Sequence, residues 1–371
     1  MAKLGEVCKL NMGQSPDSSS YNDTGDGIPF FQGNADFGEI HPNIRVWCNA
    51  PTKIAHPGEI LISVRAPIGA MNIADCECCI GRGLASISAD EAICTTKYLW
   101  YVISSKIEEL NAKGTGSTFK AVNKKTLEET EIPIRDLSEQ ERIAAYLDRV
   151  TALISLRKRQ LRKLDELVKA RFVEMFGDPV KNTMDWEIKP LSELGELNRG
   201  VSKARPRNSP ELLGGPYPLI QTGEVANAKT YITSFNSTYS EKGLAQSKMW
   251  PKGTLCITIA ANIAQTSILT FDACFPDSVV GFISRNMTNE LFIHYWFSFF
   301  QKILNEQAPQ VAQKNINLKI LSELNVIVPP LSLQNRFAAF VERVDQQKQT
   351  VQQSLEKLEL MKKALMQEYF G

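Results

Sequence analysis

The side chains with the most obvious capacity for chemistry in this chain are its eight cysteines and three histidines. Cys76, Cys78 and Cys79 are bunched, and Cys94 follows 15 residues later. Zinc sites take ligands in pairs two to four residues apart, in two clusters or beside a histidine pair. His41, His56 and His294 form no such pair. We therefore predict reduced cysteines in a cytoplasmic protein, and no metal site.

Two runs of basic side chains are candidates for binding nucleic-acid phosphates. The first has no acid between Lys113 and Glu128, and the second has none between Leu197 and Pro210. With Lys314, which matches Lys120 in a repeat described below, the candidates are Lys113, Lys120, Lys124, Lys125, Arg199, Lys203, Arg205, Arg207 and Lys314. An ordinary solvated surface explains each run equally well, so both interpretations stay open. Candidates for reading base edges are Gln32, Asn34 and Arg45, or Gln221, Asn227 and Lys248.

The charge balance of the chain is nearly neutral. The formal net charge is +1, and residues 1–137 carry 13 basic and 17 acidic side chains. A strongly basic DNA-binding domain has a different composition. Any contact with nucleic acid must therefore come from local patches or be shared with a more basic partner.

The elements that must position these residues occur twice. Residues 137–177 and 331–371 align without a gap at an offset of 194, and 16 of the 41 positions are identical. The first copy begins LSEQERIAAYLDRV and the second LSLQNRFAAFVERV. Weaker matches precede each copy, with Lys120, Asn123 and Lys125 opposite Lys314, Asn317 and Lys319. The pattern indicates two similar modules in one polypeptide, a pseudo-dimer suited to a two-fold symmetric partner such as duplex DNA.

Both copies have the apolar period of a coiled coil. Hydrophobic residues recur at alternating steps of three and four over five heptads, which indicates a helix–helix seam. The seam residues are Ile143, Leu147, Val150, Ile154, Leu161, Leu164, Val168, Phe337, Val341, Val344, Val351, Leu355, Leu358 and Leu365. Ser138 with Glu141 is typical of a capping box, and Ser332 is a candidate cap for the second helix. We predict two long helices.

Connectivity then restricts their arrangement. About 39 helical residues span roughly 58 Å, and the second module begins within about a dozen residues of the first helix's end. If the helices pack on each other, they must run antiparallel with the modules at opposite ends of a rod. The alternative is that each helix packs only on its own module.

The modules themselves have a mixed α/β pattern. Short β-branched runs at residues 59–64, 254–260 and 278–284 indicate strands, and helices are expected from Thr96 and Thr288. We predict an α+β protein with mixed α/β modules at 1–136 and 191–330, long helices at 137–177 and 331–371, and a linker at 178–190.

These residues together resemble the specificity subunit of type I restriction–modification systems, over essentially the whole chain. The resemblance rests on GTGSTFKAVNKKTL and IPIRDLSEQERI in the first half and on APQVAQKNINLKIL and VIVPPLSLQNRF in the second. The second loop lacks the glycines, and its helix entry lacks the EQ pair, so the second match is looser.

The resemblance implies a non-catalytic, sequence-reading subunit. Each target-recognition domain would read one half of a bipartite duplex DNA target, and the helical rod would set the unread gap. Two methyltransferase subunits that modify adenine at N6 would dock on the helices, and two motor–nuclease subunits would join for restriction.

The residues independently lack the marks of an enzyme. Amino-methyltransferases of that type use an Asn/Asp-Pro-Pro-aromatic quartet, whereas the only Pro-Pro here, Pro329–Pro330, lies between Val328 and Leu331. No glycine-rich nucleotide motif or P-loop occurs, so no cofactor is expected. Two alternatives stay open: a coiled-coil scaffold that binds protein partners, and the specificity chain of a system with a fused methyltransferase–nuclease.

If the rod acts as a ruler, removing or adding one heptad between Leu156 and Leu167 will change the length of the unread gap. Both half-sites will stay the same, because the recognition modules are untouched. Mapping the methylated motif measures both quantities. Altered half-sites, or an unchanged gap at full activity, would contradict the ruler.

Overall fold

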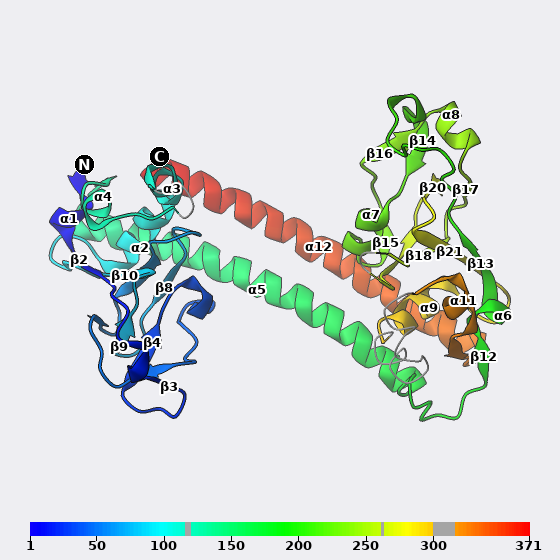
Figure 1. Ribbon diagram of the computed structural model, residues 1–371, viewed down its shortest axis with the longest axis horizontal. Coiled ribbons are helices and arrows are strands. Elements are labelled where there is room, and N and C mark those ends of the chain that lie inside the picture. The colour runs from blue at the N-terminus through cyan, green and yellow to red at the C-terminus, as the bar shows by residue number, and fades with distance from the viewer. Residues whose placement is uncertain (116–119, 261–262, 300–315) are drawn as a thin grey trace. The chain divides into compact units, whose positions relative to one another are not determined.

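The computed structural model describes residues 1–115, 120–260, 263–299 and 316–371. The chain divides into two compact units, one of Met1–Arg159 with Gln352–Gly371 and one of Gln160–Val351. Each unit combines one α/β domain with parts of two long helices, α5 (Leu137–Phe176) and α12 (Leu331–Phe370), because the division falls inside both helices (Figure 1).

The domain of the first unit is built on two sheets and a terminal strand pair. The sheet orders are β2-β10-β7-β8 and β3-β5-β4-β9-β6, and β1 pairs with β11. The strands are β1 (Ala2–Lys3), β2 (Cys8–Met12), β3 (Tyr21–Asn22), β4 (Ile28–Phe31), β5 (Trp47–Cys48), β6 (Ile54–Ala55), β7 (Ile60–Ser63), β8 (Met71–Ile73), β9 (Cys78–Ile80), β10 (Leu84–Ala89) and β11 (Glu131–Ile132). The helices are α1 (Leu4–Val7), α2 (Thr96–Ser105), α3 (Ile107–Lys113) and α4 (Lys124–Glu128), with 3₁₀ turns η1 (Ser18–Ser20) and η2 (Asn34–Asp36).

The second unit repeats this plan. Its sheet orders are β13-β21-β18-β19-β15 and β16-β14-β20-β17, and β12 pairs with β22. The strands are β12 (Ile188–Pro190), β13 (Gly195–Arg199), β14 (Leu213–Leu219), β15 (Tyr231–Ile232), β16 (Ser237–Tyr239), β17 (Met249–Trp250), β18 (Leu255–Thr258), β19 (Thr266–Leu269), β20 (Ala273–Cys274), β21 (Val279–Ser284) and β22 (Asn325–Ile327). The helices are α6 (Leu191–Leu194), α7 (Thr222–Asn227), α8 (Glu241–Ala245), α9 (Glu290–Phe297) and α11 (Leu318–Glu323), with the 3₁₀ turn η3 (Pro210–Leu212).

Strand pairing confirms that the two domains share one frame. In the first domain β10 lies between β2 and β7, and in the second β21 lies between β13 and β18. Ile87 of β10 lies opposite Leu10, and Phe282 of β21 lies opposite Leu197. The strands expected from residues 59–64, 254–260 and 278–284 are the central strands β7, β18 and β21. They are buried because both faces of these sheets are covered.

Each domain buries its apolar helix against parts of both long helices. In the first unit, Tyr98 of α2 meets Phe370 of α12 with ring centroids 5.4 Å apart, and Ile143 of α5 belongs to the same core. In the second unit, the ring of Phe292 on α9 lies 5.0 Å from that of Phe176, and Phe337 joins that core. Within each unit the start of one long helix thus lies beside the end of the other. This confirms an antiparallel helix pair and mixed α/β domains.

Most residues of the expected seam are buried. Eleven of the 14 are buried, and Leu164, Leu358 and Leu365 are half-buried. Near the end of α5 the buried positions are Phe172 and Phe176, which the 3.5-residue period does not select. A straight α-helix has 3.6 residues per turn, so the buried face drifts away from a strict heptad.

The second helix carries a charged residue in its seam. Lys348 is 9% exposed, and its ammonium lies 2.8 Å from Asp165 of α5 and 3.2 Å from Asp345. The residue 194 positions earlier is the apolar Ile154. A paired charge in an apolar seam favours one register, because any slip would leave the charge unpaired.

The predicted helix caps are wrong. The carboxylate of Asp136, not Ser138, accepts the backbone N–H of Glu139 at 2.9 Å, and the Ser138 hydroxyl donates to that same carboxylate. The second helix begins after Pro330, whose carbonyl accepts the N–H groups of Leu333 and Gln334. In both copies the helix therefore begins one residue before the expected serine.

A fully buried glutamine lies in the first turn of each long helix. Gln140 and Gln334 are both 0% exposed. The side-chain amide of Gln140 donates to the carbonyls of Ile93 at 2.9 Å and Arg135 at 2.8 Å, and its oxygen accepts the N–H of Thr95 at 2.9 Å. It therefore fixes the segment before α2 and the segment before α5 at one point.

Gln334 makes the same set of bonds in the second unit. Its amide donates to the carbonyls of Met287 at 3.0 Å and Pro329 at 2.8 Å, and its oxygen accepts the N–H of Asn289 at 3.3 Å. These three partners each lie 194 residues after their counterparts in the first unit, and Gln334 accepts one further bond, from the hydroxyl of Thr288 at 2.9 Å. The offset seen in the helices therefore extends to the segments that position them.

Among the residues described above, no helix is both long enough and apolar enough to cross a membrane.

We expect the substitution Gln140→Ala to lower the free energy of unfolding by about 2–4 kcal/mol. The change removes the Gln140 partner of one N–H and two carbonyls in a partly buried setting and opens a cavity. Urea unfolding followed by circular dichroism measures the loss. Gln353→Ala on the exposed face of α12 is the matched control, expected within about 0.5 kcal/mol of the wild type. Equal losses in the two variants would show that the buried amide contributes nothing specific.

Candidate nucleic-acid interface

One turn is built identically in the two domains. In the first it connects β9 to β10, and the N–H of Gln14 donates to the carbonyl of Ile80 at 3.0 Å. In the second it connects β20 to β21, and the N–H of Val201 donates to Phe275 at 3.1 Å. Gly13 is required beside the first turn, because a Cβ there would lie 2.2 Å from a backbone oxygen of Gly81. The turn therefore has the same place in both frames.

The second domain gathers three arginines at this turn. Arg207 donates to both carboxylate oxygens of Asp277 at 2.7 and 2.9 Å, and the guanidinium of Arg205 lies 4.0 Å from that carboxylate. Arg199 donates to the backbone carbonyl of Asp277 at 2.9 Å. Two guanidinium groups share the carboxylate of Asp277 and a third binds its backbone carbonyl, so the cluster carries excess positive charge. Lys203, on the same loop, is exposed and has no ion pair among the described residues.

In the first domain most of the expected basic run is paired with acids. Lys113 pairs with Glu109 at 2.6 Å, and Lys124 and Lys125 pair with the acids four residues later at 3.3 and 3.8 Å. Acids just outside or at the end of the run thus neutralise three of its four lysines. Lys120 is exposed and makes no ion pair within the described ranges. Lys314, the candidate from the second half, lies outside the described residues.

Two arginines that the sequence pattern did not single out lie beside Lys120. Val64 donates to the carbonyl of Gly83, and Ala66 donates to that of Lys120. These bonds bring Arg65, Arg82 and Lys120 together at the turn between β9 and β10. All three are exposed, and none has an ion pair in the described part of the chain. They were missed because they are far apart in sequence, although the repeat places Arg82 opposite Asp277.

The first domain also has a hollow of about 430 Å³ lined by candidate base readers. Gln32, Asn34 and Arg45 all line it, together with the stacked rings of Tyr21 and Phe30, whose centroids are 4.7 Å apart. The structure thus collects three side chains that the sequence could only name as options.

The corresponding candidates of the second domain are dispersed. Gln221 precedes α7, and Asn227 is the last residue of that helix. The ammonium of Lys248 lies 4.0 Å from the ring centroid of Trp250. Lys248 is exposed and therefore makes a cation–π contact with Trp250 while its ammonium also remains accessible to solvent.

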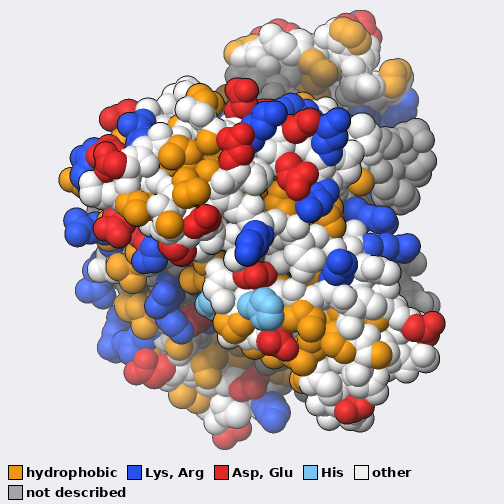
Figure 2. Space-filling model, turned by 90° about the vertical axis from the view of Figure 1, so that its left-hand side faces the viewer, with side chains coloured by type: hydrophobic (Ala, Val, Ile, Leu, Met, Phe, Trp, Pro, Cys, Tyr) orange, Lys and Arg blue, Asp and Glu red, His pale blue; other side chains and the backbone are white. Residues whose placement is uncertain are grey.

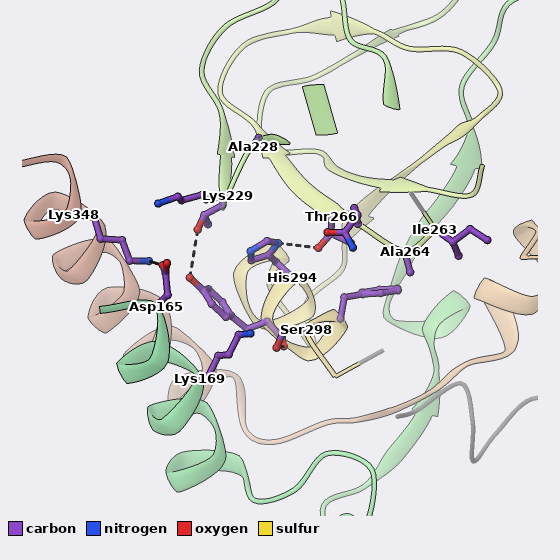
Figure 3. A pocket seen from close by; sticks show the side chains of 14 residues that line it. Asp165, Lys169, Ala228, Lys229, Ile263, Ala264, Thr266, His294, Ser298 and Lys348 are labelled. Atoms are coloured by element: carbon purple, nitrogen blue, oxygen red, sulfur yellow. Dashed lines mark hydrogen bonds and ion pairs between the residues drawn. The ribbon is translucent and has the colours of Figure 1, made fainter. Parts of the chain in front are cut away.

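A larger cavity, of about 490 Å³, lies in the second unit against both long helices (Figure 3). Lys348 reaches Asp165 across its edge, Lys169 and Lys229 also line it, and His294 contacts Thr266 at 2.9 Å. Burial, aided by the charge of Lys348, lowers the pKa of His294 to about 4, so this ring is neutral at pH 7. The cavity is therefore lined by polar and charged side chains from the second domain and from both long helices.

No cluster of three or more metal-binding side chains occurs in the residues that the structure describes. Burial raises the pKa of Cys78 to about 12, so that thiol is protonated and a poor metal ligand. On the face shown in Figure 2, basic side chains alternate with acidic and hydrophobic ones and form no continuous basic surface.

Comparison with known proteins agrees with this architecture. The family model described as type I restriction modification DNA specificity domain matches residues 1–166 and 183–360. A Methanocaldococcus jannaschii protein named as the specificity subunit of the type I restriction enzyme MjaX is 42% identical over 161 residues, 43% of this chain and 38% of the relative. That alignment therefore spans well under half of the curated relative's length.

More distant relatives match over nearly the whole chain. The EcoBI specificity subunit of Escherichia coli is 19% identical over 382 residues, 92% of this chain and 78% of the relative. A crystal structure of the type I restriction–modification S subunit from M. genitalium covers 100% of this chain and 95% of its own, with 15% identity and a TM-score of 0.59. The last of these shows a shared fold.

We expect Arg82→Ala to weaken DNA binding uniformly across sequences and to reduce the slope of log K against log salt by about 1. The reason is that one phosphate contact releases about one counterion. Binding to a duplex should be titrated between 50 and 200 mM salt for the assembled complex. Lys97→Ala, which removes an exposed cation paired with Asp148 on α5, serves as the charge-matched control. An equal change in both slopes would remove Arg82 from the interface.

Proposed function

This chain belongs to the type I restriction modification DNA specificity family, and on that premise we propose that it is the sequence-reading subunit of a type I restriction–modification complex. Each domain reads one half of a bipartite target in duplex DNA. The paired helices set the distance between the halves and provide the docking surface for methyltransferase subunits.

The observation that carries this proposal is one frame presenting two different surfaces. The central strands and both glutamine networks are equivalent in the two domains. The side chains at the shared turn differ, with Arg82 in one domain and Asp277 surrounded by three arginines in the other. A protein that reads two unlike half-sites needs this combination, since both domains must meet the duplex in similar ways.

The subunit is proposed to be non-catalytic. The Pro329–Pro330 pair has a structural role, because the Pro329 carbonyl accepts the buried amide of Gln334 at 2.8 Å. The catalytic chemistry then belongs to the partners. By the pseudo-two-fold repeat we propose two methyltransferase subunits, one for each copy of the frame, and two motor–nuclease subunits in the restricting form.

The proposal predicts adenine methylation directed by this chain. We would co-express it with the methyltransferase subunit encoded beside it in a methylation-free host and map modified adenines by long-read sequencing. The expected result is N6-methyladenine in a gapped, two-part motif. The control is the methyltransferase subunit alone, which should give no such motif.

Two other outcomes are informative. Soluble, associated proteins without methylation would favour a scaffold that binds protein partners. Methylation that requires a single chain carrying both methyltransferase and nuclease domains would place this protein in the related fused system.

A further inference from the structure

We propose that Arg45 in the first domain and Asn236 in the second occupy one equivalent base-reading position, and that Arg45 recognises guanine while Asn236 recognises adenine. This inference rests on the proposed function, because it assumes that both domains read duplex DNA. It adds the residues that distinguish the two half-sites and the base that each one selects.

The equivalence follows from strand register. Pro29 of β4 lies opposite Trp47, and Pro218 of β14 lies opposite Thr238. Both strands also pair in parallel with matching partners, since Phe30 lies opposite Cys79 and Leu219 opposite Cys274. Counting two residues back from Trp47 and from Thr238 gives Arg45 and Asn236. The two side chains therefore leave the frame at the same point.

Each of these residues is held by an acid that caps the neighbouring turn. In the first domain the carboxylate of Asp36 accepts the N–H of Gln32 at 2.8 Å and also binds the guanidinium of Arg45. In the second domain the carboxylate of Glu224 accepts the N–H of Gln221 at 3.1 Å and the amide of Asn236 at 2.9 Å. Gln32 and Gln221 each follow two residues after the matched positions Phe30 and Leu219. The same arrangement of an acid, a glutamine N–H and an exposed side chain thus recurs in both domains. The exposed side chain is Arg45 in the first domain and Asn236 in the second.

The acid leaves part of Arg45 available for recognition. Its Nη2 donates to Asp36 and to the carbonyl of Ala35, the latter at 2.9 Å. No acceptor among the described residues takes the Nη1 or Nε hydrogens, and the Arg45 side chain is 56% exposed. Asp36 is only 9% exposed, so it holds the guanidinium without itself facing the duplex. A fixed guanidinium with free donors matches guanine, whose major-groove edge offers two acceptors, N7 and O6.

The acid also determines which way Asn236 presents its amide. A carboxylate only accepts hydrogen bonds, so the Nδ2 of Asn236 must face Glu224. One Nδ2 hydrogen remains free, and Oδ1 has no donor among the described residues. This leaves one donor and one acceptor side by side on an exposed residue. That pair matches the N7 acceptor and the N6 donor of adenine.

The surroundings of Arg45 support a base edge over a phosphate. Gln32 and Asn34 line the same hollow, and their side-chain amides have no partner in the described ranges. The unpaired cations Arg65, Arg82 and Lys120 lie at the adjoining turn between β9 and β10, where Gly81 donates to the carbonyl of Phe31 beside the hollow. The first domain thus places side chains suited to phosphates next to side chains suited to bases.

The test is the methylated motif of complexes carrying Arg45→Ala, Arg45→Gln or Asn236→Ala, mapped by long-read sequencing beside the wild type. Arg45→Ala should relax one G·C pair in one half-site, with discrimination falling on the order of tenfold. Arg45→Gln keeps a donor for Asp36 and should move the preference at that same base pair toward A·T. This variant tests base recognition at position 45 even if the alanine variant is poorly folded. Asn236→Ala should relax one A·T pair in the other half-site.

Asn49→Ala is the matched control for the first domain. Asn49 is exposed, follows β5, and donates to the carboxylate of Asp26 at 2.8 Å, so it has a similar setting away from the hollow. It should leave the motif unchanged. Slower methylation of an unchanged motif by Arg45→Ala and Arg45→Gln would overturn the inference, because it would indicate a phosphate or structural contact. Relaxation at a pair other than G·C, or in both half-sites, would overturn it as well.

The wild-type result separates the two levels of the argument. A wild-type complex that methylates no bipartite motif would overturn the proposed function and this inference with it. A bipartite motif that no Arg45 or Asn236 variant alters would leave the proposed function standing and overturn the inference alone.

Discussion

The buried side-chain amides of Gln140 and Gln334 are the constraint on which each unit depends. Each amide joins the segment before the domain's apolar helix to the segment before a long helix. Losing one of these bonds leaves a backbone group that is at least partly buried without that partner, which costs free energy. The angle at which the domain meets its long helix is therefore fixed chemically as well as by packing. The aromatic contacts of Tyr98 and Phe292 add packing between each apolar helix and the long helices.

A frame held this firmly tolerates different side chains at equivalent positions. Arg82 and Asp277 occupy the same turn, and Arg45 and Asn236 leave the same strand pair. In both cases the backbone hydrogen bonds are kept while charge and donor pattern change. The internal repeat thus supplies stability from shared backbone bonds and diversity from exposed side chains, which is how one chain can present two unlike recognition surfaces.

Charge in this protein is arranged locally. Lys113, Lys124 and Lys125 are matched by nearby acids, which explains why a basic run in the sequence is nearly neutral in the fold. The arginines around Asp277 outnumber their single carboxylate. Since attraction between exposed charges fades within about 10 Å at moderate salt, such local excesses matter more than the net charge of +1.

The sequence by itself determined the features that depend on local periodicity. The 3.5-residue apolar period and the 194-residue offset predict two long helices, and the β-branched runs predict the central strands. The exact first residue of each long helix was harder to predict from the sequence. Asp136 and Ser138 are both suitable caps for the first helix, and in the structure Asp136 accepts the N–H of Glu139.

Only the tertiary structure decided which distant residues meet. Gln140 and Gln334 resemble ordinary polar residues in a first helical turn, and nothing local marks them as buried. Arg65, Arg82 and Lys120 converge because backbone bonds join strands distant in sequence. The match of Arg45 with Asn236 depends on strand register, which the chain sets by pairing segments that no short window contains. Local patterns encode single elements, whereas a site depends on contacts between them.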